Sequence, residues 1–333
     1  MRSWVALAAV VGSSVLIRRR LRRKRAIDLE GKIVAITGGS RGLGLVLART
    51  ALERGARVAI CARDGAELDR ARRDLQQHGN GVFAVRCDVT DRDEVIRFIA
   101  EVEDELGPID MLINNAGIIQ VGPVELMSHE DFDQALDANV RGPLYAMLAV
   151  LPSMRRRGAG RIVNVASIGG RIAIPHLAPY CTSKFALVGL SESMRAELAK
   201  DNIFVTTACP GLIRTGSARH AWFKGNKEAE YAWFAIGDSL PVTSVSAEMT
   251  AAKILDAGCN GDPEITISFQ AQLFSLAHGI APGLTQELFG LLARFLPDPN
   301  GARESSLGRD AETPTISKWT RLADEAARRN NEN

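Results

Sequence analysis

The sequence predicts a doubly wound α/β fold built on a parallel sheet, and three patterns support this prediction. Short runs rich in Val, Ile and Ala alternate with stretches of helical period, a glycine-rich turn follows the first of these runs, and polar residues follow several later ones. Strands that are buried on both faces of a parallel sheet have such continuous apolar sequences. The carboxyl ends of these strands share one edge of the sheet, and ligands bind at that edge.

The size and charge of the chain narrow its class. With 333 residues and a net charge of +2, it can form one large domain with appendages, and it lacks the basic bias of a nucleic-acid-binding protein. The five cysteines are scattered, with no Cys-x-x-Cys pair and no cluster with histidine. We therefore expect no metal site and no nucleic-acid partner, and a reducing compartment.

Residues 1–25 combine an apolar run with a basic run. Residues 4–17 carry no charge, and residues 18–25 read RRRLRRKR. A spanning helix needs about 20 apolar residues, so this run would cross only a thin bilayer, with Arg2 reaching the interface. A secretory signal and a disordered basic arm are the alternatives, and the basic cluster after the run disfavours the signal. We expect residues 1–25 to bind membrane lipid and to leave the rest of a membrane-associated chain facing the cytoplasm.

A glycine-rich turn follows the first predicted strand, residues 32–37. The sequence TGGSRGLG over residues 37–44 joins this strand to a helix that ends near Leu52. Glycines let the backbone turn sharply and approach a pyrophosphate, and a helix N-terminus supplies free N–H groups. The turn therefore predicts a dinucleotide cofactor.

The end of the second predicted strand, residues 57–62, favours NADP(H). An acidic residue at this position binds the ribose hydroxyls of NAD, whereas an arginine accommodates the 2′-phosphate of NADP. Ala62 is neutral, Arg63 follows it, and Arg41 in the glycine turn adds a second positive charge. The nearby Asp64 leaves NAD as the alternative.

The remaining elements continue the alternation of strands and helices. Strands are predicted over residues 81–87, 109–113, 161–166 and 264–268, and helices over residues 93–106, 131–157 and 246–257. Right-handed crossovers would gather the carboxyl ends of the strands, with Asp88 and Asn114, beside the glycine turn.

Tyr180 and Lys184 form a candidate acid/base pair. Four residues apart on a helix, the two side chains lie on one face. A lysine charge favours tyrosinate, so we expect a lowered pKa for Tyr180, which would exchange a proton with a carbonyl or alcohol oxygen. A solvated helix face is the alternative, since such pairs are common. Ser167, at the end of the preceding strand, would converge on the same place.

Taken together, these motifs resemble those of the short-chain dehydrogenase/reductase family. The matching motifs are TGGSRGLG, CDV, NNAG, NVRG, Ser167, YCTSK and Pro210-Gly211 with Thr215, in the family's order over about residues 28–215. The resemblance implies a Rossmann-like fold and an enzyme that acts on CH–OH groups with NADP as the acceptor. It also implies a homodimer or homotetramer.

The resemblance further assigns roles to individual residues. Tyr180 would be the general acid/base, Lys184 would lower its pKa and hold the nicotinamide ribose, Ser167 would bind the substrate oxygen, and Asn139 would hold a helix distortion and a water in a proton relay. The implied cofactor-binding residues are Gly38, Ser40, Arg41, Gly42, Leu43, Gly44, Arg63, Asp88, Val89, Asn115, Ala116, Gly117, Tyr180, Lys184, Pro210, Gly211 and Thr215.

The predicted domain organisation places a catalytic domain at residues 28–268 and a helical extension with a polar tail at residues 269–333. Within the domain, the aromatic residues of a substrate loop, 212–240, suggest a lid over an apolar substrate, with a small separate core or a membrane contact as alternatives. Residues 270–295 predict two apolar helices that pack on the body, face a membrane or bind a partner. Residues 297–315 are expected to be mobile, and residues 319–329 helical.

Three functions remain in competition. The leading hypothesis is a membrane-attached, NADP(H)-dependent enzyme that interconverts a carbonyl and an alcohol on a lipophilic substrate such as a steroid, retinoid or fatty acyl compound. The second is a 3-oxoacyl thioester reductase that acts on a carrier protein. The third is a NADP-sensing scaffold without chemistry.

Overall fold

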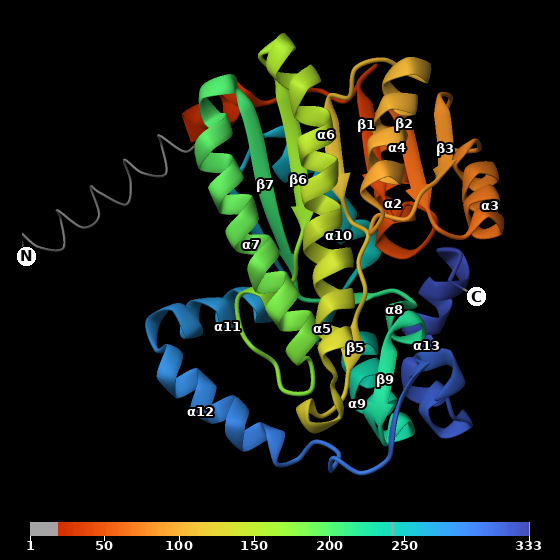
Figure 1. Cartoon of the computed structure of the whole chain (residues 1–333), viewed down its shortest axis with the longest axis vertical. Coiled ribbons are helices and arrows are strands. Elements are labelled where there is room, and N and C mark those ends of the chain that lie inside the picture. The colour runs from red at the N-terminus through yellow and green to blue at the C-terminus, as the bar shows by residue number, and fades with distance from the viewer. Residues whose placement is uncertain (1–18, 241–242, 333) are drawn as a thin grey trace, which may run out of the picture.

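The chain folds around one seven-stranded parallel sheet (Figure 1). The computed structural model describes residues 19–240 and 243–332. The strand order is β11-β7-β6-β4-β1-β2-β3, with every neighbouring pair parallel. The strands are β1 (Ile33–Thr37), β2 (Arg57–Ala62), β3 (Val82–Arg86), β4 (Met111–Asn114), β6 (Gly160–Val165), β7 (Ile203–Pro210) and β11 (Glu264–Ile267).

Six of these strands lie within two residues of their predicted bounds. The seventh, β7, was not predicted, although it lies between β6 and β11 in the sheet. Its sequence IFVTTACP is entirely buried, including the polar Thr206 and Thr207. The Thr206 hydroxyl donates to the carbonyl of Asp262 at 2.7 Å, which allows a polar group to be buried in the strand.

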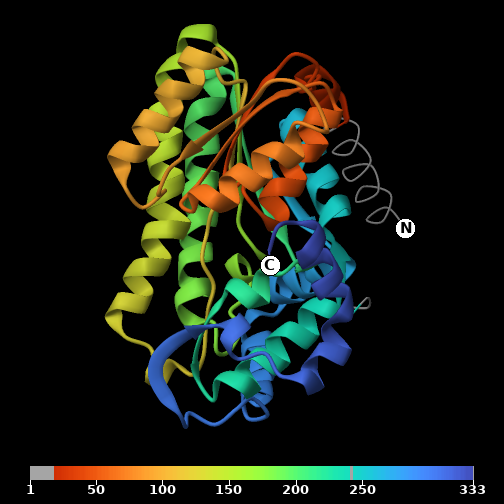
Figure 2. The ribbon, with the colours of Figure 1, turned by 90° about the vertical axis from the view of Figure 1, so that its right-hand side faces the viewer.

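Helices cover both faces of the sheet, so that the molecule has three layers (Figure 2). One layer contains α2 (Gly42–Glu53), α3 (Gly65–Leu75) and α10 (Ala247–Cys259), and the other contains α4 (Arg92–Glu105), α6 (Gly142–Arg157) and α7 (Ala178–Leu198). Alternate residues of β1 divide between the layers, with Val34 and Ile36 on the α2 side and Ile33 and Ala35 on the α4 side. Both faces of the sheet are therefore apolar.

The long helix predicted over residues 131–157 is interrupted. It consists of α5 (His129–Leu136), a π-helical turn at Asp137–Arg141 and α6. Such turns widen a helix locally and are frequent at functional sites. Asn139 lies within this turn.

A smaller unit lies beyond the carboxyl edge of the sheet. It contains a three-stranded sheet of β5 (Gln120–Val121), β9 (Trp222–Gly225) and β12 (Ala302–Leu307), a two-stranded sheet of β8 (Leu212–Arg214) and β10 (Ser244–Ser246), and the helices α8 (Ser217–His220), α9 (Lys227–Ser239) and α13 (Pro314–Arg329). Part of residues 297–315, which were expected to be a mobile segment, is a strand instead, because β12 pairs antiparallel with β9. α13 also begins earlier than predicted.

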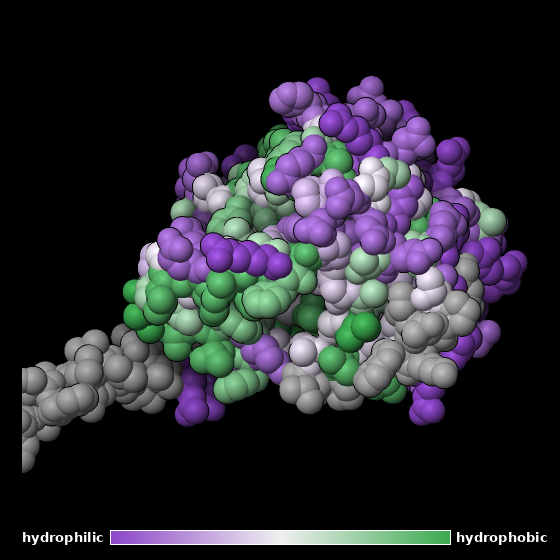
Figure 3. Space-filling model, turned by 90° about the horizontal axis from the view of Figure 1, so that it is seen from below, coloured by the Kyte–Doolittle hydropathy of each residue, from purple (hydrophilic) through white to green (hydrophobic). Residues whose placement is uncertain are grey.

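Helices α11 (Phe269–Ile280) and α12 (Pro282–Ala293) form an apolar hairpin that projects from the body (Figure 1). Within them only Ala271 and Thr285 are buried. Ile280 and Leu284 are 75% and 73% exposed, and Phe295 just beyond α12 is 81% exposed. Hydrophobic side chains consequently gather on this part of the surface (Figure 3). The prediction of two apolar helices is confirmed, but they pack on the body to a small extent only.

The end of the basic run is docked at the amino ends of the strands. Residues 19–25 are helical, Arg22 pairs with Asp262 at 2.9 Å, and the Arg25 guanidinium lies 4.6 Å from the centre of the Phe204 ring. The apolar run predicted to be an anchor, residues 4–17, lies outside the described residues. Among residues 19–240 and 243–332, no helix combines the length and apolar character needed to cross a bilayer.

Candidate active site

A cleft of about 600 Å³ lies at the carboxyl edge of the sheet. Every candidate site residue from the sequence lines it: the glycine turn, the residues that follow β2, β3 and β4, Asn139, Ser167, Tyr180, Lys184 and the segment after β7. The fold thus brings together residues that are widely separated in the sequence.

The glycine turn approaches the end of β4 so closely that side chains are excluded. Gly38 has a φ of +65°, and a Cβ there would lie 2.8 Å from the Cα of Ala116. A Cβ at Gly44 would overlap the carbonyl oxygen of Gly38. The first turn of α2, which contains no acidic residue, faces the cleft beside this turn. Such a turn is the part of a dinucleotide-binding fold that accepts phosphates.

Asn115 ties the turn to β4. Its side-chain amide donates to the carbonyls of Thr37 at 3.2 Å and Gly38 at 3.0 Å. In return, the Thr37 hydroxyl accepts the backbone N–H groups of Asn115 at 3.1 Å and Ala116 at 3.2 Å. These four bonds hold the ends of β1 and β4 in register, which fixes the floor of the cleft.

The region predicted to select the cofactor contains an acidic residue, Glu67, that was not predicted from the sequence. Glu67 pairs with Arg41 at 2.7 Å and accepts a hydrogen bond from the Ser40 hydroxyl. Asp64 caps α3 by accepting the Glu67 N–H at 2.8 Å, and this bond lowers the pKa of Asp64. Arg63 is exposed at the rim. A sequence can reveal that Glu67 lies three residues after a helix cap, but it does not reveal that this carboxylate pairs with Arg41.

Asn139 connects the π-helical turn to α7. Its amide nitrogen donates to the Ile118 carbonyl at 3.1 Å and the Ser183 hydroxyl at 2.9 Å, and its oxygen accepts the Ile118 N–H at 3.0 Å. The side chain is fully buried. Asn139 therefore positions the start of α7, where Tyr180 and Lys184 lie.

Tyr180, Ser167 and Lys184 converge at the centre of the cleft. The Lys184 ammonium donates to the Val165 carbonyl at 2.9 Å and lies 5.7 Å from the centre of the Tyr180 ring. Burial raises the pKa of Tyr180, and a hydrogen bond with Ser167 opposes this shift. Burial also lowers the pKa of Lys184 to about 8. The expected lowering of the Tyr180 pKa is therefore wrong for this structure, because desolvation outweighs the effect of the hydrogen bond with Ser167.

The end of the cleft beyond Tyr180 is largely apolar. Its lining residues there include Ile119, Ile174, Leu177, Trp222 and Phe234. One carboxyl group, Asp238, is also buried in the lining. Burial raises its pKa to about 7, although the Ser217 hydroxyl donates to it at 3.1 Å. Asp238 was not among the candidate residues from the sequence, and no local motif marks it.

The aromatic segment after β8 is mainly a small core. The Phe223 ring lies 5.6 Å from that of Tyr231 and 6.1 Å from that of Phe234, in edge-to-face arrangements. All three side chains are buried with Val121 and Leu177. Most of this segment therefore forms a small separate core, which was the alternative to a lid over the substrate. Trp222 and Phe234 nevertheless reach the cleft.

Comparisons with known proteins agree with this geometry. A family model described as short chain dehydrogenase matches residues 32–224. The chain is similar to gluconate 5-dehydrogenase of Gluconobacter oxydans, with 36% identity over 188 residues that cover 56% of this chain and 73% of that protein. It is also similar to human dehydrogenase/reductase SDR family member 4, with 35% identity over 205 residues that cover 61% of this chain and 74% of that protein.

Two further similarities concern a bacterial relative and a solved structure. A putative ketoacyl reductase of Streptomyces coelicolor is 35% identical over 191 residues, which cover 57% of this chain and 73% of that protein. The crystal structure of a short-chain dehydrogenase from Streptomyces avermitilis superposes with a TM-score of 0.67 and 28% identity, and covers 79% of this chain and 98% of that one.

Lys184→Met should remove a pH dependence of stability. The pKa of Lys184 is about 8 in the fold, against an ordinary value of 10.5. Between these values the unfolded chain retains a proton that the folded chain has lost, so the native protein gains stability as the pH rises. The Tm of the native protein minus that of the variant should therefore increase from pH 8 to pH 10, by roughly 2–4 °C for each kcal/mol gained.

The exposed Lys253, on α10, provides the matched control. Lys253→Met should keep the same pH slope as the native protein in thermal unfolding. If the Tm values of the native protein and of Lys184→Met change equally with pH, then Lys184 is not a buried, destabilised ammonium.

Proposed function

The chain belongs to the short-chain dehydrogenase family, and from this premise we propose that it interconverts a carbonyl and an alcohol on a lipophilic substrate with NADP(H). Membership makes it an oxidoreductase that uses a nicotinamide dinucleotide. The observation that carries the proposal is the convergence of Tyr180, Ser167 and Lys184 on the cleft that contains the glycine turn.

The residues of the cleft fit a dinucleotide. The glycine turn has space only for backbone, and the first turn of α2 presents N–H groups to a phosphate. Lys184 and the segment at Pro210 and Gly211 lie farther along the same cleft, where the nicotinamide end would be held. The bound cofactor supplies the hydride that the substrate carbon gains or returns.

The proposed chemistry at the substrate oxygen follows from the states of the side chains. A raised pKa keeps Tyr180 protonated at neutral pH, which is the form that donates a proton to a carbonyl oxygen as negative charge develops on it. Ser167 donates a second hydrogen bond to that oxygen. The Lys184 ammonium, beside the ring, stabilises the tyrosinate that remains. Asn139 keeps the start of α7 in place throughout.

The lining of the cleft supports a lipophilic substrate over a carrier-bound thioester. Trp222 and Phe234, with three aliphatic side chains, line the end of the cleft beyond Tyr180. The relative from Streptomyces coelicolor is named a ketoacyl reductase, which keeps the thioester alternative open to test. A scaffold without chemistry is the third hypothesis, and the complete Ser167, Tyr180 and Lys184 set favours an enzyme. A panel of free ketones and acyl thioesters would separate these functions.

The proposed preference for NADP(H) rests on Arg41 and Arg63 at the adenosine end of the cleft. Both arginines line it, and Asp64 is engaged as a helix cap. Glu67 opposes the preference by pairing with Arg41, so Arg63 is the one of these two arginines without a carboxylate partner among the ion pairs of the described residues. Arg63 is therefore the residue to change.

The proposed membrane attachment uses residues 1–25 and the α11–α12 hairpin. Residues 19–25 dock at the amino ends of β7 and β11, and α11 follows the carboxyl end of β11, so both lie at the β11 edge of the sheet but at opposite ends of its strands (Figure 1). The hairpin exposes many large apolar side chains, as a lipid-facing surface would. We also propose a homo-oligomer through α6 and α7, where Leu148 and Phe185 are exposed.

Tyr180→Phe should lower the rate of NADPH-dependent reduction of a lipophilic ketone by roughly 10²–10⁴-fold, because the general acid is lost. The Kd for NADPH should change by less than about threefold, since the ring remains. Tyr145→Phe, outside the cleft on α6, should leave both quantities unchanged. Undiminished turnover in Tyr180→Phe would refute the proposed mechanism.

Arg63→Asp should reduce the ratio of NADPH to NADH affinity by about tenfold or more, because a positive partner of the 2′-phosphate becomes negative. Arg72→Asp makes the same charge change on the outer surface of α3 and should preserve the ratio. Titration of each protein with NADPH and with NADH measures this ratio of affinities. An unaltered ratio in Arg63→Asp would show that Arg63 does not select the cofactor.

Deleting residues 1–25 should move the protein from the membrane to the soluble fraction of a cell lysate. With the full chain, Ile280→Asp should weaken flotation with vesicles of mixed neutral and anionic lipids, because a charge enters an apolar surface. Ile96→Asp, at an exposed apolar position of α4, is the control and should have no effect. A full-length chain found entirely in the soluble fraction would disprove the attachment.

A further inference from the structure

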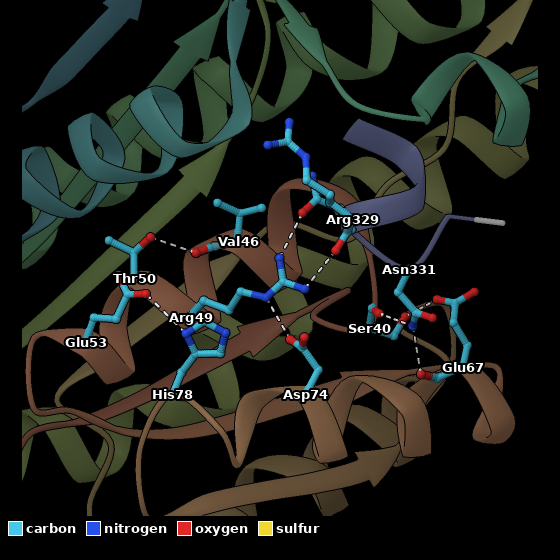
Figure 4. Close-up of polar contacts among 11 residues, drawn as sticks. Ser40, Val46, Arg49, Thr50, Glu53, Glu67, Asp74, His78, Arg329 and Asn331 are labelled. Atoms are coloured by element: carbon cyan, nitrogen blue, oxygen red, sulfur yellow. Dashed lines mark hydrogen bonds and ion pairs between the residues drawn. The ribbon is translucent and has the colours of Figure 1, made fainter. Parts of the chain in front are cut away.

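The C-terminal segment of the chain crosses the glycine turn. α13 ends at Arg329, and the following residues lie against the start of α2. The Gly42 N–H donates to the Asn330 carbonyl at 2.9 Å. The Asn331 amide donates to the carbonyls of Ser40 at 2.8 Å and Glu67 at 3.0 Å (Figure 4). Residues 330–332, which we call the strap, therefore bond to the backbone of the predicted phosphate site.

Glu332 occupies the space that Gly42 leaves. A Cβ at Gly42 would lie 3.0 Å from a carboxylate oxygen of Glu332. The other oxygen accepts the Gly216 N–H at 2.6 Å, from the segment on the opposite wall of the cleft. Glu332 is only 4% exposed, and burial raises its pKa to about 7. The carboxylate thus lies between the two walls of the cleft at its phosphate end.

Two arginines fasten the strap to the surrounding helices. Arg49 on α2 donates to the Asn330 side chain and to the Arg329 carbonyl, both at 2.9 Å, and pairs with Asp74 at 2.7 Å (Figure 4). Arg70 on α3 donates to the Asn331 side chain at 2.9 Å. The strap is consequently held by side chains as well as by the backbone of the turn.

The strap and a dinucleotide require the same donors and the same space. A pyrophosphate at a glycine turn accepts N–H groups from the start of the helix and lies where the glycine has no side chain. Here the Gly42 N–H is bonded to Asn330, and the adjoining space contains a carboxylate. The first turn of α2 has no acid of its own, so Glu332 is the anion that complements the helix end. The strap and a phosphate group cannot occupy this position together.

We propose that the strap is an autoinhibitory segment, which must leave the glycine turn before a dinucleotide binds. The inference rests on the proposed function, because it takes a dinucleotide as the ligand of the cleft. The apparent affinity for the cofactor is then the intrinsic affinity multiplied by the fraction of molecules in which the strap is released. A strap docked in about nine of ten molecules weakens cofactor binding about tenfold.

Hydrogen exchange of the unaltered chain tests the displacement directly. Saturating NADPH should accelerate amide exchange in residues 326–332 while it slows exchange in residues 38–44, because the strap leaves as the cofactor enters. Slower exchange in both segments would mean that the strap closes over the cofactor, and this result would overturn the proposal. No variant is needed for this measurement.

Cofactor titration provides the second test. Glu332→Ala and a chain that ends at Arg329 should each bind NADPH more tightly than the unaltered chain, by about tenfold for the shortened chain. Glu325→Ala removes an exposed carboxylate that pairs with Arg321 on the outer side of α13, and it should leave the Kd unchanged. Asn331→Ala removes the contacts with Ser40 and Glu67. If the strap competes with the cofactor, this variant should also bind NADPH more tightly, as Glu332→Ala does.

The outcomes separate this inference from the proposed function. Equal or weaker NADPH binding by all three strap variants, compared with the unaltered chain, would overturn autoinhibition and leave the proposed function intact. If neither the unaltered chain nor the shortened chain binds a nicotinamide dinucleotide, the proposed function and the inference are both refuted.

Discussion

The close approach of the glycine turn to the end of β4 is the constraint on which the rest of the molecule depends. A Cβ at Gly38 would lie 2.8 Å from the backbone of Ala116, and the Asn115 amide closes the remaining gap with bonds to two carbonyls of the turn. This contact directs the first turn of α2 into the cleft. The parallel sheet then places the ends of β6 and β7 at the same edge, so that Ser167 and the start of α7 face the phosphate site along one cleft.

Much of this arrangement could be predicted from the sequence because its signals are local. Continuous apolar runs such as residues 32–37 and 57–62 correspond to β1 and β2, and motif residues follow the strands at the predicted edge. β7 escaped prediction because Thr206 and Thr207 interrupt its apolar pattern, and the bond from Thr206 to Asp262 that compensates this polarity comes from another part of the chain. β12 is polar and largely exposed, and only its pairing with β9 makes it a strand.

The properties that could not be predicted depend on burial and on distant partners. The spacing of Tyr180 and Lys184 predicts their proximity, but the direction of each pKa shift is decided by desolvation, which the spacing does not contain. Glu67 and Glu332 have ordinary surroundings in the sequence, and their roles arise from contacts with Arg41 and Gly216 in the fold. The exposure of α11 and α12 is a similar case, since a helical apolar pattern shows which residues share a face but not what covers it.

The position of Glu332 also has a practical consequence for protein engineering. Because the side chain of this residue is buried between Gly42 and Gly216, a substitution at position 332 alters the mouth of the cleft itself. A labelling residue introduced there, such as a cysteine that carries a fluorescent reporter, would therefore displace the docked carboxylate, and the labelled protein would differ from the native one in the region that receives the nucleotide. A label in an exposed loop, for example at Asn80 between α3 and β3, would avoid this disturbance.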